Sequence, residues 1–75
     1  MQVKTKFNVK DEVFFLKNSK IESHLIHSVQ INIEQNGDIR VSYYVRIYKT
    51  ENDYIFETLK EENCFASREE LIYQL

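Results

Sequence analysis

Two runs of alternating apolar residues constrain this chain most, because they meet at a strong turn signal, Asn36-Gly37. Odd positions from 21 to 33 are aliphatic except for Ser23 and His27, and odd positions from 39 to 47 are aliphatic or, at Tyr43, aromatic. A period of two is typical of strands with one buried face. The sequence therefore predicts a long β-hairpin in a small sheet-based fold, and nothing in the hairpin supplies a reactive group.

The length of the hairpin loop decides which residues face each other. A two-residue Asn-Gly turn would pair Ile33 with Arg40, and so set an inward apolar residue against an outward polar one. A three-residue loop at 35–37, with Gly37 in the left-handed conformation of a bulge, keeps the inward faces matched. It pairs Ile33 with Ile39, Ile31 with Val41 and Val29 with Tyr43.

Shorter elements surround the hairpin. We expect a strand at 13–17, a turn at 18–19, hairpin strands at 21–34 and 38–49, a polar turn at 50–53 and a last strand at 54–60. The first hairpin strand is too long to stay flat, so it should bend at Ser23 or Ser28. For the last strand, Tyr54 and Phe56 favour one inward face and Ile55 and Leu59 the other, unless a bulge reconciles them.

The C-terminal residues predict a short helix. Ser67 and Glu70 have the Ser-x-x-Glu spacing of a capping box, and Leu71, Ile72 and Leu75 follow at helical intervals. We expect a closing helix at 67–75 that Phe65, Leu71 and Leu75 anchor to the sheet. The expected core also includes the five phenylalanines and Tyr43.

Two segments resemble a known family. Residues 7–13 read Phe-Asn-Val-Lys-Asp-Glu-Val, and residues 64–71 read Cys-Phe-Ala-Ser-Arg-Glu-Glu-Leu. The chain resembles small uncharacterised bacterial and phage proteins with SH3-like barrels, in which F-x-V-G-D-x-V starts the barrel and F-x-[ST]-K-E-E-L starts the closing helix. Lys10 stands where that pattern usually has glycine. The resemblance implies architecture and a prophage or mobile-element origin, and it carries over no catalytic residue.

These observations predict one mainly β domain over residues 1–75. Its expected form is a small SH3-like antiparallel barrel, or a strongly bent open sheet, with the one short C-terminal helix. The chain has 75 residues, so its core is small, and oligomerisation would supplement it. Its net charge is −2. Cys64 is the single cysteine, which favours a reducing compartment, and no apolar run reaches a membrane span. We expect a cytoplasmic protein with no membrane association.

The sequence favours neither a metal site nor an enzyme. His24 and His27 would point to opposite faces of a strand and could not share one ion. Cys64 lies beside Phe65 in the helix-docking segment, where a buried filler role is expected. Glu70 and its neighbours are explained by the first helical turn, and one glycine cannot build a phosphate loop. We expect no catalytic residues, no cofactor and no metal.

The outward face of the second hairpin strand is the best candidate for binding. Its even positions alternate cations with aromatic rings, and the expected register sets Ile26 beside Arg46 and His24 beside Tyr48. Such a face can stack bases or cradle a peptide. The candidate binding residues are Arg40, Tyr44, Arg46, Tyr48 and Ile26.

Two functions fit this face, beside the plainer interpretation of an ordinary solvated strand. The first is a protein-interaction or assembly module, in which the partner is another protein or a second copy that forms a homodimer; the acidic balance favours it. The alternative is a nucleic-acid binder that adds Lys17, Lys20 or Lys49 at the loops. Carboxylates of Glu22, Glu34 and Glu57 around the arginines would weaken the alternative.

Overall fold

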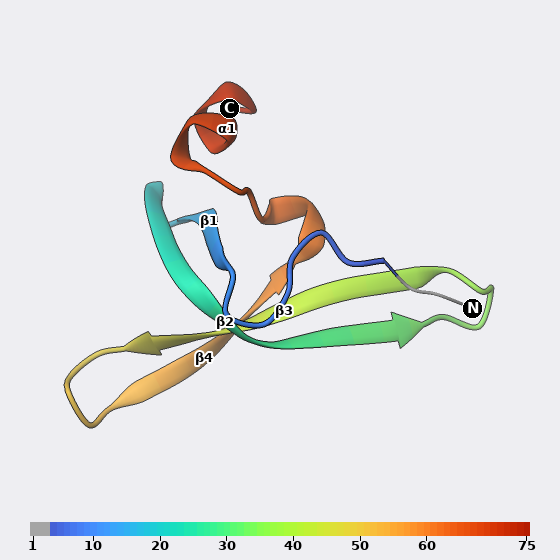
Figure 1. The fold of residues 1–75 in the computed structure, drawn as a ribbon, viewed down its shortest axis with the longest axis horizontal. Helices are drawn as coiled ribbons and strands as arrows, with labels where there is room; N and C mark the ends of the chain where they lie inside the picture. The colour runs from blue at the N-terminus through green and yellow to red at the C-terminus, as the bar shows by residue number, and fades with distance from the viewer. Residues whose placement is uncertain (1–3) are drawn as a thin grey trace.

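The computed structural model describes residues 4–75, which form one four-stranded antiparallel sheet and a short C-terminal helix (Figure 1). Neighbouring strands in the sheet are also neighbours in sequence. The elements are β1 (Glu12–Lys17), β2 (Lys20–Ile33), β3 (Ile39–Tyr48), β4 (Tyr54–Lys60), a 3-10 helix η1 (Glu61–Asn63) and α1 (Arg68–Tyr73). The predicted strand bounds are confirmed to within one residue.

Both hairpin turns on β2 use left-handed backbone. Asn18 and Ser19 have φ of 53° and 64°, a pair of positive values that matches the twist of a two-residue hairpin. Gly37 has φ of 90°, and its N–H donates to the carbonyl oxygen of Glu34 at 2.9 Å. The three-residue loop is therefore confirmed, together with its register: Ile33 faces Ile39, Ile31 faces Val41 and Val29 faces Tyr43.

One extra residue in β2 reverses its faces. Ile26 pairs with Val45 but Ser28 pairs with Tyr44, so His27 is an unpaired bulge residue. Beyond the bulge the odd positions face inward, whereas before it the even positions do, because a one-residue slip exchanges the faces of a strand. The expected inward position of Leu25 is therefore wrong, and this side chain is exposed. The bend is next to Ser28 and not at Ser23, which pairs regularly with Phe14.

The core lies on the concave side of the bent sheet. Its buried side chains come from all four strands and from the segments at both ends: Phe7, Val13, Phe15, Ile26, Tyr43, Val45, Leu59 and Cys64. The hydroxyl of Tyr43 donates to Oε2 of Glu61 at 2.5 Å and accepts the N–H of Phe7 at 3.2 Å. Burial, followed by the hydrogen bond to Glu61, raises the pKa of Tyr43 to about 12. This hydroxyl ties the N-terminal segment and η1 to β3.

The sheet is not closed. Within residues 4–75 no strand pairing joins β1 to β4. The segment between η1 and α1 contacts β1 through a single antiparallel bridge, from Phe65 to Phe14. The hairpins project in different directions from the centre of the fold (Figure 1). Of the two expected forms, the structure shows the strongly bent open sheet with one short C-terminal helix, and the SH3-like barrel is not confirmed.

β4 follows β3 in unbroken register from Ser42 opposite Lys60 to Tyr48 opposite Tyr54. Leu59 is buried and Ile55 half-buried, so no bulge reconciles the two alternatives in β4, and its odd positions face inward. Phe56, expected in the core, lies on the outer face and is 48% exposed.

The closing helix is shorter than expected. Ser67 is its N-cap, and its hydroxyl accepts the N–H of Glu70 at 3.1 Å, which confirms the capping half of the predicted box. Leu71 is buried and Phe65 half-buried, as anchors should be. Leu75 is exposed and does not anchor the helix, because α1 ends two residues before it.

Candidate functional site

A group of rings surrounds one guanidinium on the outer face of β3 and β4. The Cζ atom of Arg46 lies 4.8 Å from the ring centroid of Tyr54, 5.5 Å from that of Phe56 and 6.0 Å from that of Tyr48. These are cation–π distances. With the adjoining imidazole of His27, we call this group the Arg46 cluster: His27, Arg46, Tyr48, Tyr54 and Phe56.

The strand register and the β2 bulge build the cluster. Arg46 lies opposite Phe56 and Tyr48 opposite Tyr54, so the turn between β3 and β4 sets these side chains on one face. The ring centroids of Tyr48 and Tyr54 are 5.5 Å apart, as are those of Tyr54 and Phe56. The extra residue in β2 brings His27 within 5.1 Å of Phe56, centroid to centroid. About half of each Tyr48, Tyr54 and Phe56 side chain remains exposed.

Hydrogen bonds orient the guanidinium within the cluster. Nη1 of Arg46 donates to the hydroxyl of Tyr48 at 3.1 Å, and Nη2 donates to Nδ1 of His27 at 3.3 Å. The bond to Tyr48 raises the pKa of Arg46 above its ordinary value. Nε is buried and has no partner among the described residues. Each terminal nitrogen keeps a further N–H, so the oriented cation can still bind an acceptor of a ligand.

The structure brings together only some of the predicted binding residues. Arg46 and Tyr48 are in the cluster, and Tyr44 is half-buried two positions along β3, between Ser28 and Thr58. Arg40 lies toward the other end of β3, where its Nε is 3.0 Å from Oε1 of Glu34.

Ile26 does not belong to this surface. Its side chain is 2% exposed and packs in the core, because the bulge at His27 turns it inward. The expected pairs of Ile26 with Arg46 and of His24 with Tyr48 are wrong for the same reason: His24 faces Val13 of β1. His24 is half-buried, whereas His27 is exposed.

Sequence reasoning missed three members of the cluster. Tyr54 and Phe56 share the parity of Arg46 and Tyr48 across a short turn, and this signal was present in the sequence. The prediction left the inward face of this strand open and counted Phe56 among the core residues. His27 could not be assigned without the position of the bulge.

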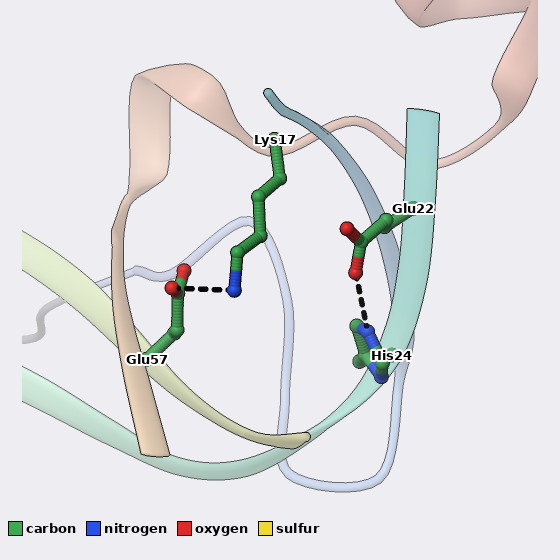
Figure 2. Close-up of polar contacts among 4 residues, drawn as sticks. All are labelled: Lys17, Glu22, His24 and Glu57. Atoms are coloured by element: carbon green, nitrogen blue, oxygen red, sulfur yellow. Dashed lines mark hydrogen bonds and ion pairs between the residues drawn. The ribbon is translucent and has the colours of Figure 1, made fainter. Parts of the chain in front are cut away.

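Within residues 4–75, no carboxylate forms an ion pair with Arg46. Figure 2 shows Lys17 and Glu57 reaching toward each other from β1 and β4, with Nζ of Lys17 2.8 Å from Oε1 of Glu57. The same view shows Glu22 turned to His24, with 3.1 Å between Oε1 and Nε2. The hydrogen bond to Glu57 raises the pKa of Lys17. Of the three carboxylates that would weaken a nucleic-acid site, only Glu34 lies beside an arginine, Arg40.

Reactive groups are not assembled elsewhere in the described part of the chain. Cys64 is fully buried, its Sγ lies 3.5 Å from the carbonyl oxygen of Lys60, and burial raises its pKa to about 11. His24 and His27 have different partners on different faces. Residues 4–75 contain no group of three or more His, Cys, Asp or Glu side chains placed to hold a metal ion. No helix within these residues has the length and apolar character to cross a membrane.

Comparison of this chain with protein-family models, curated proteins and solved structures finds no match.

Proposed function

We propose that this chain is a small non-enzymatic binding module that docks a partner protein through the Arg46 cluster. The observation that carries the proposal is the group of three half-exposed rings around an oriented guanidinium. Tyrosine and arginine are enriched among the residues that dominate binding energy in protein interfaces. Rings held by strand pairing lose little conformational entropy when a partner covers them.

The charges favour a protein over a nucleic acid as the partner. Binding to a phosphate backbone depends on the number of cations that neutralise phosphates. Here Arg40 is paired with Glu34 and Lys17 with Glu57, and the chain has a net charge of −2. Arg46, with Lys49 next to Tyr48 in the sequence, would supply only a few phosphate contacts beside the stacking rings. A protein partner needs only to cover the rings and offer an acceptor to the guanidinium.

One observation favours a second candidate, a binder of single-stranded nucleic acid. Glu22 and Glu57 contact His24 and Lys17, and neither forms an ion pair with Arg46. Exposed rings can stack on bases of any sequence. This candidate requires affinity for mixed oligonucleotides that falls steeply between low and physiological salt.

The architecture also supports a kinship proposal, that the chain is a relative of the SH3-like proteins of bacteria and phages. Lys10 stands at the glycine position of their opening motif and has φ of 76°, a left-handed conformation that glycine adopts without strain. The bridge from Phe14 to Phe65 returns the chain to its first strand, as barrel closure requires. A prophage or mobile-element origin and a cytoplasmic location belong to this proposal, and the lone thiol of Cys64 suits that compartment.

Site-specific photo-crosslinking tests the docking surface. A benzophenone amino acid replaces Tyr54 in the cluster or, as the control, Tyr73, which is 86% exposed on α1. We expect a defined protein adduct in expressing cells from position 54 and none from position 73. Equal adducts from both positions, or none from position 54, would contradict the proposal.

A pair of arginine variants then tests the cation. Arg46→Ala should reduce the yield of the adduct at least tenfold, whereas Arg40→Ala, on the same strand and face, should leave it within about twofold. Equal losses from both variants would indicate general electrostatic attraction and favour the nucleic-acid candidate. Oligonucleotide titrations of the same two variants at low and physiological salt decide between the partner classes.

A further inference from the structure

One edge of β2 is unpaired among the described residues. β1 pairs with β2 only along Lys20–Leu25, and the N-terminal segment reaches no further than Ile26, whose N–H donates to the carbonyl oxygen of Asp11 at 2.9 Å. Beyond the bulge, residues 28–33 pair with β3 on one side alone. This half of the hairpin projects away from the rest of the sheet (Figure 1).

The register shows which backbone groups face the open edge. The N–H of Glu34 donates to the carbonyl oxygen of Asp38 at 2.8 Å, so Glu34 directs its backbone groups to β3. In an antiparallel ladder, alternate residues direct both N–H and C=O to the same side. Gln30 and Asn32 therefore bond to β3, and Val29, Ile31 and Ile33 direct their N–H and C=O groups to the open edge.

The open edge lacks the features that keep strands from pairing. Residues 28–33 read Ser-Val-Gln-Ile-Asn-Ile and contain no charge, no proline and no glycine. Proteins protect exposed edges with lysine, proline or bulges, and here the bulge lies before the segment. On the inner face, Ile31 is 45% exposed and Ile33 62% exposed. Both the backbone and the apolar side chains of this edge are therefore available to another strand.

We propose that β2 pairs with β2 of a second copy, antiparallel about a two-fold axis at Ile31. In this register Ile31 faces Ile31 of the second copy, Val29 faces Ile33, and Gln30 faces Asn32. Inward side chains meet inward ones on both copies, and a shift by one residue would destroy this match. The edge residues supply paired N–H and C=O groups on both sides of the axis. Two four-stranded sheets thereby become one continuous sheet.

The charges near the axis are compatible with this pairing. Along β2, the charged side chain nearest to the axis is that of Glu34, which comes opposite the neutral Ser28 of the second copy and is already paired with Arg40. An isologous contact closes at two copies and leaves no complementary edge for growth. β4, at the other edge of the sheet, carries the charged side chains of Glu57 and Lys60. A second copy is thus the occupant that the edge itself complements.

This dimer goes beyond the proposed docking function and does not depend on it, because it uses the β2 edge and not the Arg46 cluster. The paired segment is short compared with a standard interface, so the dimer should dissociate on dilution. Residue-resolved amide exchange of the wild-type protein therefore tests it between about 5 µM and about 500 µM.

The exchange pattern has a built-in control. Amides of Gln30 and Asn32 should be protected at every concentration, since they bond to β3. Amides of Val29, Ile31 and Ile33 should exchange rapidly in dilute solution and at least tenfold more slowly in concentrated solution. Equal behaviour of the two sets, or a monomer at the highest concentration by sedimentation velocity, would overturn the proposal.

Matched lysine variants give a second test. Ile31→Lys places two charges on the axis and should remain monomeric, whereas Ile39→Lys, on the inner face of β3, should dimerise as the wild type does. A dimer formed by the Ile31→Lys variant would refute the proposed pairing of β2 with β2 of the second copy. If Ile31→Lys fails to fold, the exchange pattern of the wild type decides the question.

Discussion

The hydroxyl of Tyr43 should contribute a large share of the stability of this small domain. It donates to the carboxylate of Glu61 and accepts the N–H of Phe7, and the whole Tyr43 side chain is buried. Tyr43→Phe keeps the ring, which packs edge-on against Phe7 with 5.7 Å between centroids. The variant therefore removes only the two hydrogen bonds.

The expected loss of stability depends on the groups that lose a hydrogen-bond partner in Tyr43→Phe. A hydrogen bond to a charged group contributes about 1.5–3 kcal/mol, and a buried N–H without a partner costs about 1–3 kcal/mol. Glu61 is half-buried and also accepts the N–H of Lys6 at 3.0 Å, so water and that bond recover part of the loss. We expect a loss of about 2–3 kcal/mol in the free energy of unfolding, which lowers the Tm of a domain of this size by about 10–20 °C.

Urea and thermal unfolding followed by far-UV circular dichroism measure this loss. The control is Tyr48→Phe, which removes an exposed hydroxyl from the Arg46 cluster and should change stability by less than about 0.5 kcal/mol. A second measurement uses tyrosinate absorbance. Because the pKa of Tyr43 is raised from 10.0 to about 12, its contribution to stability is complete below pH 10 and is lost as the pH rises toward 12. Equal losses from Tyr43→Phe and Tyr48→Phe, or an unchanged late titration in Tyr43→Phe, would refute the reasoning.

Three further predictions concern the backbone, the thiol and the ion pair. Lys10→Gly should stabilise the protein by about 0.5–1 kcal/mol in urea unfolding, because it relieves a left-handed lysine, whereas Lys20→Gly in β2 should destabilise it by a similar amount. Since burial raises the pKa of Cys64 to about 11, iodoacetamide should leave the thiol of the native protein unmodified at neutral pH and alkylate it promptly in urea. Prompt alkylation of the native protein would show that the thiol is accessible to solvent. The raised pKa of Lys17 means that its pair with Glu57 stabilises the fold at neutral pH, and that this stabilisation is lost as the pH rises beyond 10.5. Glu57→Gln should therefore flatten that part of the curve of urea midpoint against pH. An unaltered curve would count against the pair.

Local rules predicted much of this fold. The turn at Gly37 and the three pairs beside it follow from a match of inward faces across one short loop, and the cap at Ser67 follows from four consecutive residues. Part of the candidate site was predictable in the same way. Arg46 and Tyr48 share a face because they are two positions apart in one strand, and this relation holds in any sheet.

Other features depend on contacts that no short window of sequence contains. The bulge at His27 sets Ile26 opposite Val45 in the core and turns His27 to Phe56, and a strand with apolar residues of both parities is compatible with either arrangement. Phe56 was expected in the core, yet β4 buries its odd residues because Leu59 fills the space beside Tyr43. These choices depend on which residues best fill one shared volume, and that comparison involves all four strands at once.

By itself the sequence determined the strands, their turns and the pairing beside the loop at Gly37, because a short loop leaves few ways to match two alternating strands. Only the tertiary structure decided that the sheet stays open, that β2 changes face at His27 and that Tyr54 and Phe56 join Arg46. The physical reason is that one inserted residue exchanges the two faces of a strand, and the packing of the whole core decides where that residue is inserted.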